Sequence, residues 1–423
     1  MDALLPIRAG VPQDFDPVME LLLAAFHQNP DPDLHHVEQG VFEPDRSLVV
    51  TDGDRVVGHA GAYTRELTVP GAVLPAAHVT LVAVAPTDRR RGLLTRLMHR
   101  QLRQLRDGGE PVAVLWASEG RIYPRYGYGM AAQRLELDVD LRETRVLDPA
   151  GPGAGADPSA GPGIGPGVGS LRVGDPGQLR PDLAAVYERL RPGRPGWSGR
   201  NDRWWRYVLA DSPARQSGQT ALRVVLHDGP TGPDGYALWR TVSDWDARGP
   251  KGRVRVIEAV AGSVDAYRAL WRFLTGIDLS RALSFRFATL DEPLFQLVDE
   301  PRQLGAALAD SLWVRLVDVA AALSARRYAA GVDVVVDVTD PLLPENSGRW
   351  RLTGDREQAR CVPTDEPADL ACGVADLAAV YLGGPSLRSL ADAGRVRELR
   401  HGAVAEANTA FGWDRAPAGI EIF

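Results

Sequence analysis

The chain has 423 residues, of which 44% are hydrophobic, and it carries a formal net charge of −7 at pH 7. This length allows two or three domains with sizeable cores, and the acidic balance argues against a general nucleic-acid binder. The only two cysteines, Cys361 and Cys372, do not suggest a disulfide framework or a cysteine-rich metal site. No secretory signal is visible and no apolar run is long enough to span a bilayer, so we expect a cytoplasmic protein.

The first 75 residues predict one helix and the beginning of an antiparallel sheet. In chain order we expect a strand at 7–9, a helix at 12–26, strands at 47–51 and 55–63 joined by Asp52-Gly53-Asp54, and a continuation of the sheet through 66–74. Residues 29–36 are expected to form an acidic loop with paired histidines. A solvated loop is a better interpretation of these histidines than a metal site, because their spacing is not typical of metal ligands.

Residues 78–105 predict a strand, a basic turn and a helix. Apolar and β-branched residues alternate up to Pro86, which cannot donate to a sheet and therefore ends the strand. After three arginines and Gly92, leucines recur with the period of one helical face. Such a turn directs free backbone N–H groups and the positive end of a helix dipole at one point, where a diphosphate would fit.

Neither of two common phosphate-binding loops is present in this turn, since it lacks both GxxxxGK[ST] and GxGxxG. The stretch V-x-V-x-P-x-x-R-R-x-G instead resembles the acetyl-CoA loop of the GNAT superfamily of N-acetyltransferases. Arg89, Gly92 and Leu94 occupy the positions of that superfamily's motif [QR]xxGx[GA], and Leu94 departs from it. The alternative is an arginine-rich surface turn without a ligand.

A second motif follows a predicted buried strand at 111–117. The run IYPRYGY, residues 122–128, resembles the superfamily's signature fYxxxGF and places Tyr123 at the position of the general acid. Tyr126 is a rival for this role, but the spacing to Gly127 favours Tyr123. A packed aromatic residue with its hydroxyl at the surface is the structural alternative.

The rest of the chain predicts two further folded regions. A strand at 135–141 is expected to close the first domain, and the Gly/Pro-rich residues 149–169 read as a flexible linker. Residues 179–288 repeat the order helix, hairpin, strand, turn, helix, strand, but their turn, Val260 to Val264, lacks the arginines, so we expect that cofactor binding has been lost there. From Leu312 the pattern is α+β. It includes helices expected at 366–382, at 387–393 and 396–400, and at 404–411.

The whole chain apart from the linker resembles the enhanced intracellular survival (Eis) family of N-acetyltransferases. The most specific pieces are VTLVAVAPTDRRRGLL, WASEGRIYPRYGYG and LWVRLVDVAAALSARRY. The resemblance implies two tandem GNAT folds followed by an α+β domain similar to sterol carrier proteins. The implied limits are 1–147 for a catalytic GNAT domain, 148–172 for the linker, 173–303 for a degenerate GNAT domain and 304–423 for the C-terminal domain.

The resemblance also implies a site for acetyl-CoA as co-substrate, with no metal. Val82, Ala83 and Val84 would run alongside the acetyl-pantetheine arm, Arg90, Arg91, Gly92, Leu93, Leu94 and Thr95 would hold the diphosphate, and Ser118 and Glu119 would flank the thioester. Tyr123 would be the general acid and the carboxylate of Phe423 the general base. Family members acetylate amines of aminoglycosides and lysine side chains and assemble as hexamers. From the residues themselves, an oligomer is indicated only by Trp204-Trp205, which we expect to form an exposed aromatic seam.

Several alternatives stay open from the sequence. The C-terminal domain could carry a lipid or another hydrophobic ligand, or the whole chain could be a catalytically silent scaffold. If the Phe423 carboxylate is not the base, Glu421 or Glu119 could take that role. Ile420, Ile422 and Phe423 are apolar and resemble an edge strand that buries itself, which would place the end of the chain inside the protein.

Overall fold

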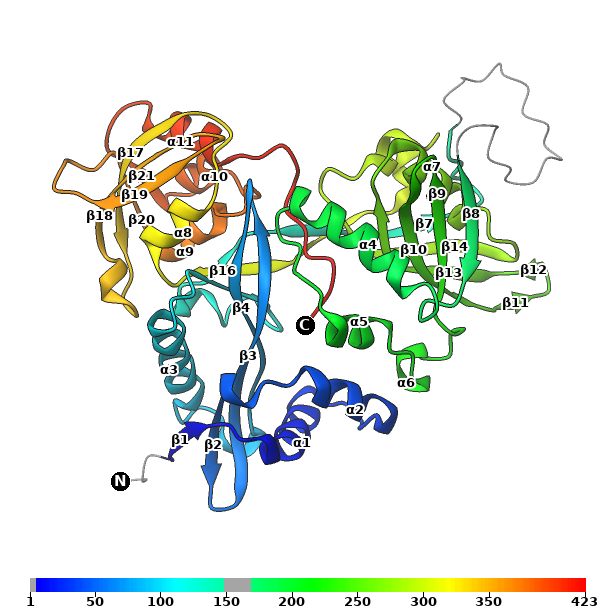
Figure 1. The fold of residues 1–423 in the computed structure, drawn as a ribbon, viewed down its shortest axis with the longest axis horizontal. Coiled ribbons are helices and arrows are strands. Elements are labelled where there is room, and N and C mark those ends of the chain that lie inside the picture. The colour runs from blue at the N-terminus through cyan, green and yellow to red at the C-terminus, as the bar shows by residue number, and fades with distance from the viewer. Residues whose placement is uncertain (1–4, 148–168) are drawn as a thin grey trace. The chain divides into compact units, whose positions relative to one another are not determined.

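The computed structural model describes residues 5–147 and 169–423 (Figure 1). Most of the predicted linker, 148–168, lies outside the described residues. Its last residues are not linker, because β8 (Ser170–Gly174) is a strand. The chain divides into two compact units, one of residues 1–133, 192–199 and 310–423 and one of 134–191 and 200–309.

The first unit contains a seven-stranded sheet in the order β1-β2-β3-β4-β5-β16-β6. Its strands are β1 (Ile7–Ala9), β2 (Ser47–Asp52), β3 (Arg55–Val69), β4 (Ala72–Val84), β5 (Val112–Trp116), β6 (Gly129–Met130) and β16 (Leu312–Leu316), and its helices are α1 (Phe15–Phe26), α2 (Pro32–Val41) and α3 (Leu93–Asp107). The early strands, the first helix and the strand–turn–helix are confirmed. The prediction of an acidic loop at 29–36 is wrong in its second half, where α2 begins. The Asp31 side chain caps this helix by accepting a hydrogen bond from the Asp33 N–H, and both histidines lie on the helix.

One strand of each large sheet comes from a distant part of the chain. The strand expected to close the first domain lies instead in the second sheet, as β7 (Gln133–Asp140), where it pairs with β14 (Ser280–Ala288). The first sheet is completed by β16, which lies antiparallel to both β5 and β6. Each of these two sheets thus contains a strand from outside the domain limits that the sequence predicts. Those limits therefore remain a proposal.

The second unit repeats the plan of the first. Its sheet has the order β15-β7-β14-β13-β10-β9-β8, with β9 (Arg223–Gly229), β10 (Gly232–Val242), β13 (Gly252–Ala261) and β15 (Ala307–Asp310), and its helices are α4 (Arg180–Leu190), α5 (Asp202–Leu209), α6 (Pro213–Gln216) and α7 (Val264–Thr275). The prediction that Trp204 and Trp205 form an exposed aromatic seam is wrong. Trp204 and Trp205 are 3% and 2% exposed, and Trp205 packs edge-on against Tyr187.

The C-terminal part of the first unit is a five-stranded sheet covered by helices. The sheet has the order β19-β18-β17-β20-β21, with β17 (Val332–Thr339), β18 (Gly348–Gly354), β19 (Ala359–Pro363), β20 (Leu370–Gly373) and β21 (Val396–Glu398), and the helices are α8 (Val319–Ala325), α9 (Val374–Val380), α10 (Leu387–Asp392) and α11 (Ala403–Phe411). The helices at 387–393 and 404–411 are confirmed, as α10 and α11. The helix at 366–382 begins only at Val374, after β20, and the helix at 396–400 is wrong, because Val396 pairs with Cys372 in the sheet.

A buried charge joins the helices of this C-terminal part. The Arg326 guanidinium is fully buried and donates to the carbonyls of Val380, Tyr381 and Phe411. It also lies over the ring of Tyr328, 4.6 Å from the centroid. A buried charge needs hydrogen-bond partners, and the carbonyls at the C-terminal ends of α9 and α11, which have no partner within their own helices, provide them.

Within residues 5–147 and 169–423 no helix combines the length and apolar character needed to cross a bilayer. No group of three or more histidine, cysteine, aspartate or glutamate side chains in the same ranges is arranged to hold a metal ion.

Candidate active site

The candidate site lies where β4 and β5 separate. The two strands pair in parallel only from Ala76 with Val112 to His78 with Val114, although β4 continues to Val84. Opposite β3 the register of β4 shifts between the pairs His59–Ala83 and Gly61–Thr80, and Leu81 has a φ of +52°. This bulge turns β4 away from β5, so that backbone groups of β4 beyond His78 are not bonded to β5. An extended ligand with amide groups can bond to such a strand edge.

A buried histidine supports the bulge. The His59 side chain is completely buried, and its Nδ1 lies 2.6 Å from the carbonyl oxygen of Leu81. Burial lowers the pKa of His59 to about 4, so the ring is neutral at pH 7 and Nδ1–H donates to the carbonyl. The sequence did not single out His59, because nothing local shows that its side chain meets the bulge of the neighbouring strand.

The turn between β4 and α3 is organised by Asp88. Its carboxylate is buried and accepts from Arg91 at 2.6 Å and from Arg55 at 3.1 Å. These bonds hold the pKa of Asp88 below its usual range, together with the bond from the Thr87 hydroxyl, which is the largest cause. The Arg91 side chain is therefore held by Asp88. The guanidinium groups next to it in the sequence, rather than that of Arg91, would contact a bound anion.

The N-terminus of α3 is open. Gly92 is its N-cap, with a φ of +74° and no side-chain cap bond, and Arg90 also has a positive φ of +66°. A Cβ atom placed on Gly92 would meet no atom within 4 Å. Arg89 and Arg90 are exposed and form no ion pair with any described residue. Uncapped N–H groups, a helix dipole and two unpaired guanidinium groups fit a diphosphate.

The two candidate tyrosines differ in what their hydroxyls do. The Tyr126 hydroxyl is bonded to Thr95 Oγ1 at 3.2 Å, which ties the tyrosine loop to the first turn of α3. Tyr123 is 6% exposed, and its hydroxyl has no hydrogen-bond partner among the described residues. Burial, with the neighbouring Tyr126 as a second cause, raises the pKa of Tyr123 to about 12. Tyr123 therefore stays protonated at neutral pH and is the tyrosine with a proton available to a ligand.

The other expected contact residues lie around the same gap. Val82, Val84 and Leu94 are half-buried, Ala83 and Leu93 are buried, and Thr95, Ser118 and Glu119 are exposed. Val82 packs against both hydrophobic clusters that meet at β4, one with Tyr123 and one with α1. The structure thus brings the expected residues of β4, the α3 turn and the segment after β5 to one region, with the side chain of Arg91 as the exception already described.

The chain end lies beside β4, but it is not a strand. Ile420 is 8% exposed, whereas Ile422 is 51% exposed and residues 416–423 have no strand conformation, so the expected self-burying edge strand is wrong. The Phe423 ring packs on the buried imidazole of His78, with 4.7 Å between the ring centroids. Glu421 is paired with Arg65 and is therefore a poor candidate for the base.

Tyr123 and Phe423 lie on opposite faces of β4. Tyr123 belongs to the hydrophobic cluster of Ala77 and Val79, whereas Phe423 packs against the cluster that contains Ala76. Since successive side chains of a strand point to opposite faces, the two residues flank β4 near the place where it leaves β5.

The corresponding turn of the second unit is closed by its own side chains. Ser263 caps α7 by accepting from the Ala266 N–H at 3.0 Å, and its hydroxyl donates to the Asp234 carboxylate at 2.7 Å. Asp234 also bonds to His227 Nδ1 at 2.5 Å, and the Asp234 carbonyl accepts from the Gly262 N–H. A carboxylate therefore stands at the start of α7, where it repels a diphosphate.

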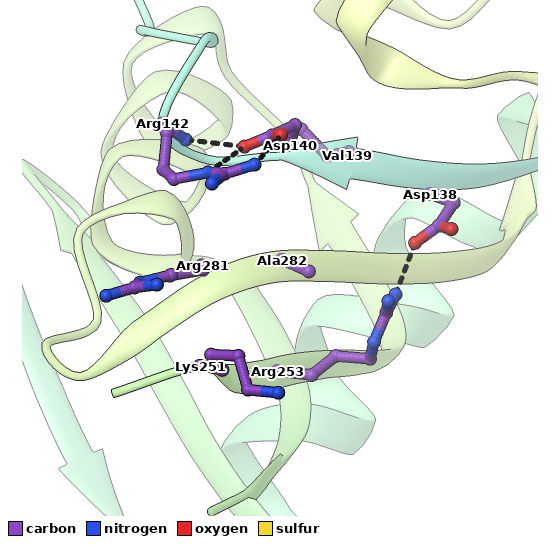
Figure 2. A pocket seen from close by; sticks show the side chains of 8 residues that line it. All are labelled: Asp138, Val139, Asp140, Arg142, Lys251, Arg253, Arg281 and Ala282. Carbon is purple, nitrogen blue, oxygen red and sulfur yellow. Dashed lines mark hydrogen bonds and ion pairs between the residues drawn. The ribbon is translucent and has the colours of Figure 1, made fainter. Parts of the chain in front are cut away.

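The second unit also has a surface pocket of about 310 Å³ over β7, β13 and β14 (Figure 2). It is rich in arginine, and three of its four cations are paired with carboxylates, whereas Arg281 donates to the backbone carbonyl of Arg248. Arg142 is bonded to Asp140, Arg253 to Asp138, and Lys251 lies 3.3 Å from Asp244. Carboxylates therefore offset most of the positive charge of this lining, which makes it a poorer diphosphate site than the turn before α3.

The C-terminal part contains a small apolar cavity of about 10 Å³. It is lined by Val336, Leu370, Cys372, Asp376, Leu377, Val380, Leu387, Val396 and Phe411. This volume is close to that of a single water-sized probe. No space for a lipid is present there, so nothing in this cavity favours the carrier alternative.

Comparison with known proteins identifies two related domains followed by a third of another type. Models of the acetyltransferase (GNAT) domain match residues 6–131 and 196–316, and a sterol carrier protein domain matches 319–418. An uncharacterized N-acetyltransferase of Streptomyces avermitilis is 47% identical over 90% of each chain, and the N-acetyltransferase Eis of Mycobacterium tuberculosis is 38% identical over 91% of each. The crystal structure of Eis1 from Mycobacterium abscessus superimposes with a TM-score of 0.82 at 32% identity, covering 99% of this chain and all of that one.

Proposed function

Since the chain belongs to the Eis family of GNAT N-acetyltransferases, we propose that it transfers the acetyl group of acetyl-CoA to primary amines of aminoglycoside-like or lysine-containing substrates. The contrast between its two GNAT domains supports placing the reaction in the first. There the N-terminus of α3 is open and the Tyr123 hydroxyl bonds to no described residue, whereas Ser263 and Asp234 close the start of α7. The hexamer implied by the resemblance stays an expectation.

The proposed reaction uses one base and one acid. The amine must be neutral to attack, so the Phe423 carboxylate accepts its proton directly or through water. An ordinary α-carboxyl group has a pKa of about 3.5 and is ionised at neutral pH. The new C–N bond then forms as the C–S bond breaks, Tyr123 donates its proton to the departing sulfur, and the second proton that the nitrogen loses returns to the Tyr123 oxygen through water.

The acid step is energetically acceptable despite the burial of Tyr123. Its pKa of about 12 lies above the ordinary thiol value of about 8.5, so transfer of the proton to a thiolate is uphill by about 5 kcal/mol. An enzyme that turns over about ten times per second has a barrier of about 16 kcal/mol. The transfer therefore fits within the barrier, and the same burial keeps the donor protonated.

Turnover of acetyl-CoA with a panel of amines tests the proposed function. We expect release of free CoA, measured with a thiol reagent, with aminoglycosides or with lysine-containing peptides, and an acetylated product detected by mass spectrometry. Hydroxyl compounds of similar size without amines should give no turnover. Acetylation of none of these amines would contradict the proposal.

One acetyl-CoA site per chain is expected, in the first GNAT domain. Arg90→Glu combined with Gly92→Asp places two carboxylates at the open N-terminus of α3 and should abolish binding in titration calorimetry, because they repel the diphosphate. Val264→Glu is the matched control, since it adds a carboxylate at the exposed first residue of α7, and it should leave affinity unchanged. Two equal sites per chain would overturn this assignment.

A further inference from the structure

A segment that connects two helices of the second unit belongs to the first unit. Residues 192–199 lie along the distal part of β3, where the Gly196 N–H donates to Thr68 O, the Thr68 N–H to Trp197 O, and the Gly199 N–H to Glu66 O, at 2.8 to 2.9 Å. Leu67 and Ser198 form an antiparallel bridge. The segment thus pairs with β3 through a single isolated bridge and three backbone hydrogen bonds.

The other side of the segment holds the end of the chain. The Ala418 N–H donates to Pro195 O at 2.9 Å, and Arg194 donates to Ala416 O at 3.0 Å. Gly196 has a φ of +94°, and a Cβ atom there would lie 2.5 Å from Ala418 O. Glycine is therefore required at this point, because only its small size allows the two backbones to approach this closely.

One buried arginine joins β3, the 192–199 segment and the end of the chain. Arg65 on β3 is 5% exposed; its Nε donates to Gly199 O at 2.9 Å, and its guanidinium is paired with Glu421. A single planar guanidinium group thus bonds to the 192–199 segment and to the chain end at once. Because the pair is buried, breaking it leaves an uncompensated charge, so the arrangement is specific.

A buried histidine and serine lie directly under the last residue. The Ser198 hydroxyl lies 2.7 Å from His78 Nε2, and His78 Nδ1 lies 3.0 Å from Ala76 O. Burial, with the Arg65 charge as a second cause, lowers the pKa of His78 to about 3, so the ring is neutral. Nδ1–H then donates to the carbonyl and Nε2 accepts from Ser198. Both ring nitrogens are used, and the ring plane is fixed where Phe423 packs against it.

We propose that Ser198 and His78 are positioning residues, which set the location of the C-terminal residue relative to the gap between β4 and β5. The 192–199 segment would then be a contribution of the second GNAT domain to the site of the first. His78 does not act as a base in this arrangement, because its free lone pair is occupied by the Ser198 hydroxyl. An effect of these residues on kcat rests on the proposed role of the Phe423 carboxylate as base. Their effect on the position of Phe423 does not depend on that role.

Ser198→Ala in the full-length protein separates these two consequences. It removes the hydroxyl that orients His78, and the ring is then free to rotate under Phe423. We expect carboxypeptidase to release Phe423 at least about tenfold faster, as followed by mass spectrometry, because a loosened chain end enters a protease site more often. We also expect kcat to fall about tenfold, with acetyl-CoA affinity unchanged.

Two variants serve as controls. Ser198→Thr keeps the hydroxyl and should restore slow release. Ser386→Ala removes the N-cap of α10, which lies outside this arrangement, and should change neither release nor kcat even if it lowers Tm to the same extent. Faster release with lower kcat supports both proposals, and faster release with unchanged kcat supports the positioning but contradicts the base. Release at the wild-type rate in Ser198→Ala overturns the positioning, whatever the activity.

Discussion

Addition of one glycine after Phe423 is expected to reduce kcat by about 100-fold or more, which is the typical contribution of a general base. The extension moves the α-carboxylate by one residue and replaces it with a peptide carbonyl, which does not accept a proton at neutral pH. Folding and acetyl-CoA binding should be unchanged, since the residues of the α3 turn are untouched. Steady-state kinetics, calorimetry and thermal unfolding measure the three quantities.

Substitution of the last side chain provides the matched control for this extension. Phe423→Leu keeps the carboxylate at the same place and loses part of the packing on His78, so its loss of kcat should be several-fold smaller than that of the extension. Normal kcat in the extended protein would exclude the carboxylate as base. The role would then pass to Glu119, which is exposed near the end of β5, because Glu421 is paired with Arg65.

Tyr123→Phe is expected to lower kcat by about 100-fold or more, with little change in acetyl-CoA affinity. The substitution keeps the ring and removes the proton. Because the hydroxyl has no partner among the described residues, Tm should stay near the wild-type value. The raised pKa of about 12 means that the donor remains protonated throughout an assay range up to pH 10, so this group should cause no alkaline loss of wild-type activity there.

Tyr126→Phe tests the choice between the two tyrosines. It breaks the bond to Thr95, which should weaken acetyl-CoA binding moderately because that bond ties the tyrosine loop to the α3 turn, but it should leave kcat within several-fold of wild type. An inactive Tyr126→Phe together with a fully active Tyr123→Phe would show that the general acid was assigned to the wrong residue.

The sequence alone was sufficient for features that depend on neighbouring residues. The period of two up to Pro86, the change to a helical period after Gly92 and the turn at Asp52-Gly53-Asp54 each arise from local backbone preferences, and β4, α3 and the β2–β3 hairpin follow them. The expectation that the second GNAT domain has lost cofactor binding also rests on a local feature. Its turn has no arginine, and the structure adds that Ser263 and Asp234 close it.

Only the tertiary structure decided which distant segments meet. The alternating residues of β7 suit a half-buried strand in either sheet, and long-range packing determines that β7 pairs with β14. Likewise no local pattern marks residues 192–199 as a partner of β3, or His78 and Ser198 as neighbours of Phe423. Burial and hydrogen bonding between segments more than a hundred residues apart determine these contacts, because each polar group removed from water must find its partner wherever the folded chain supplies one.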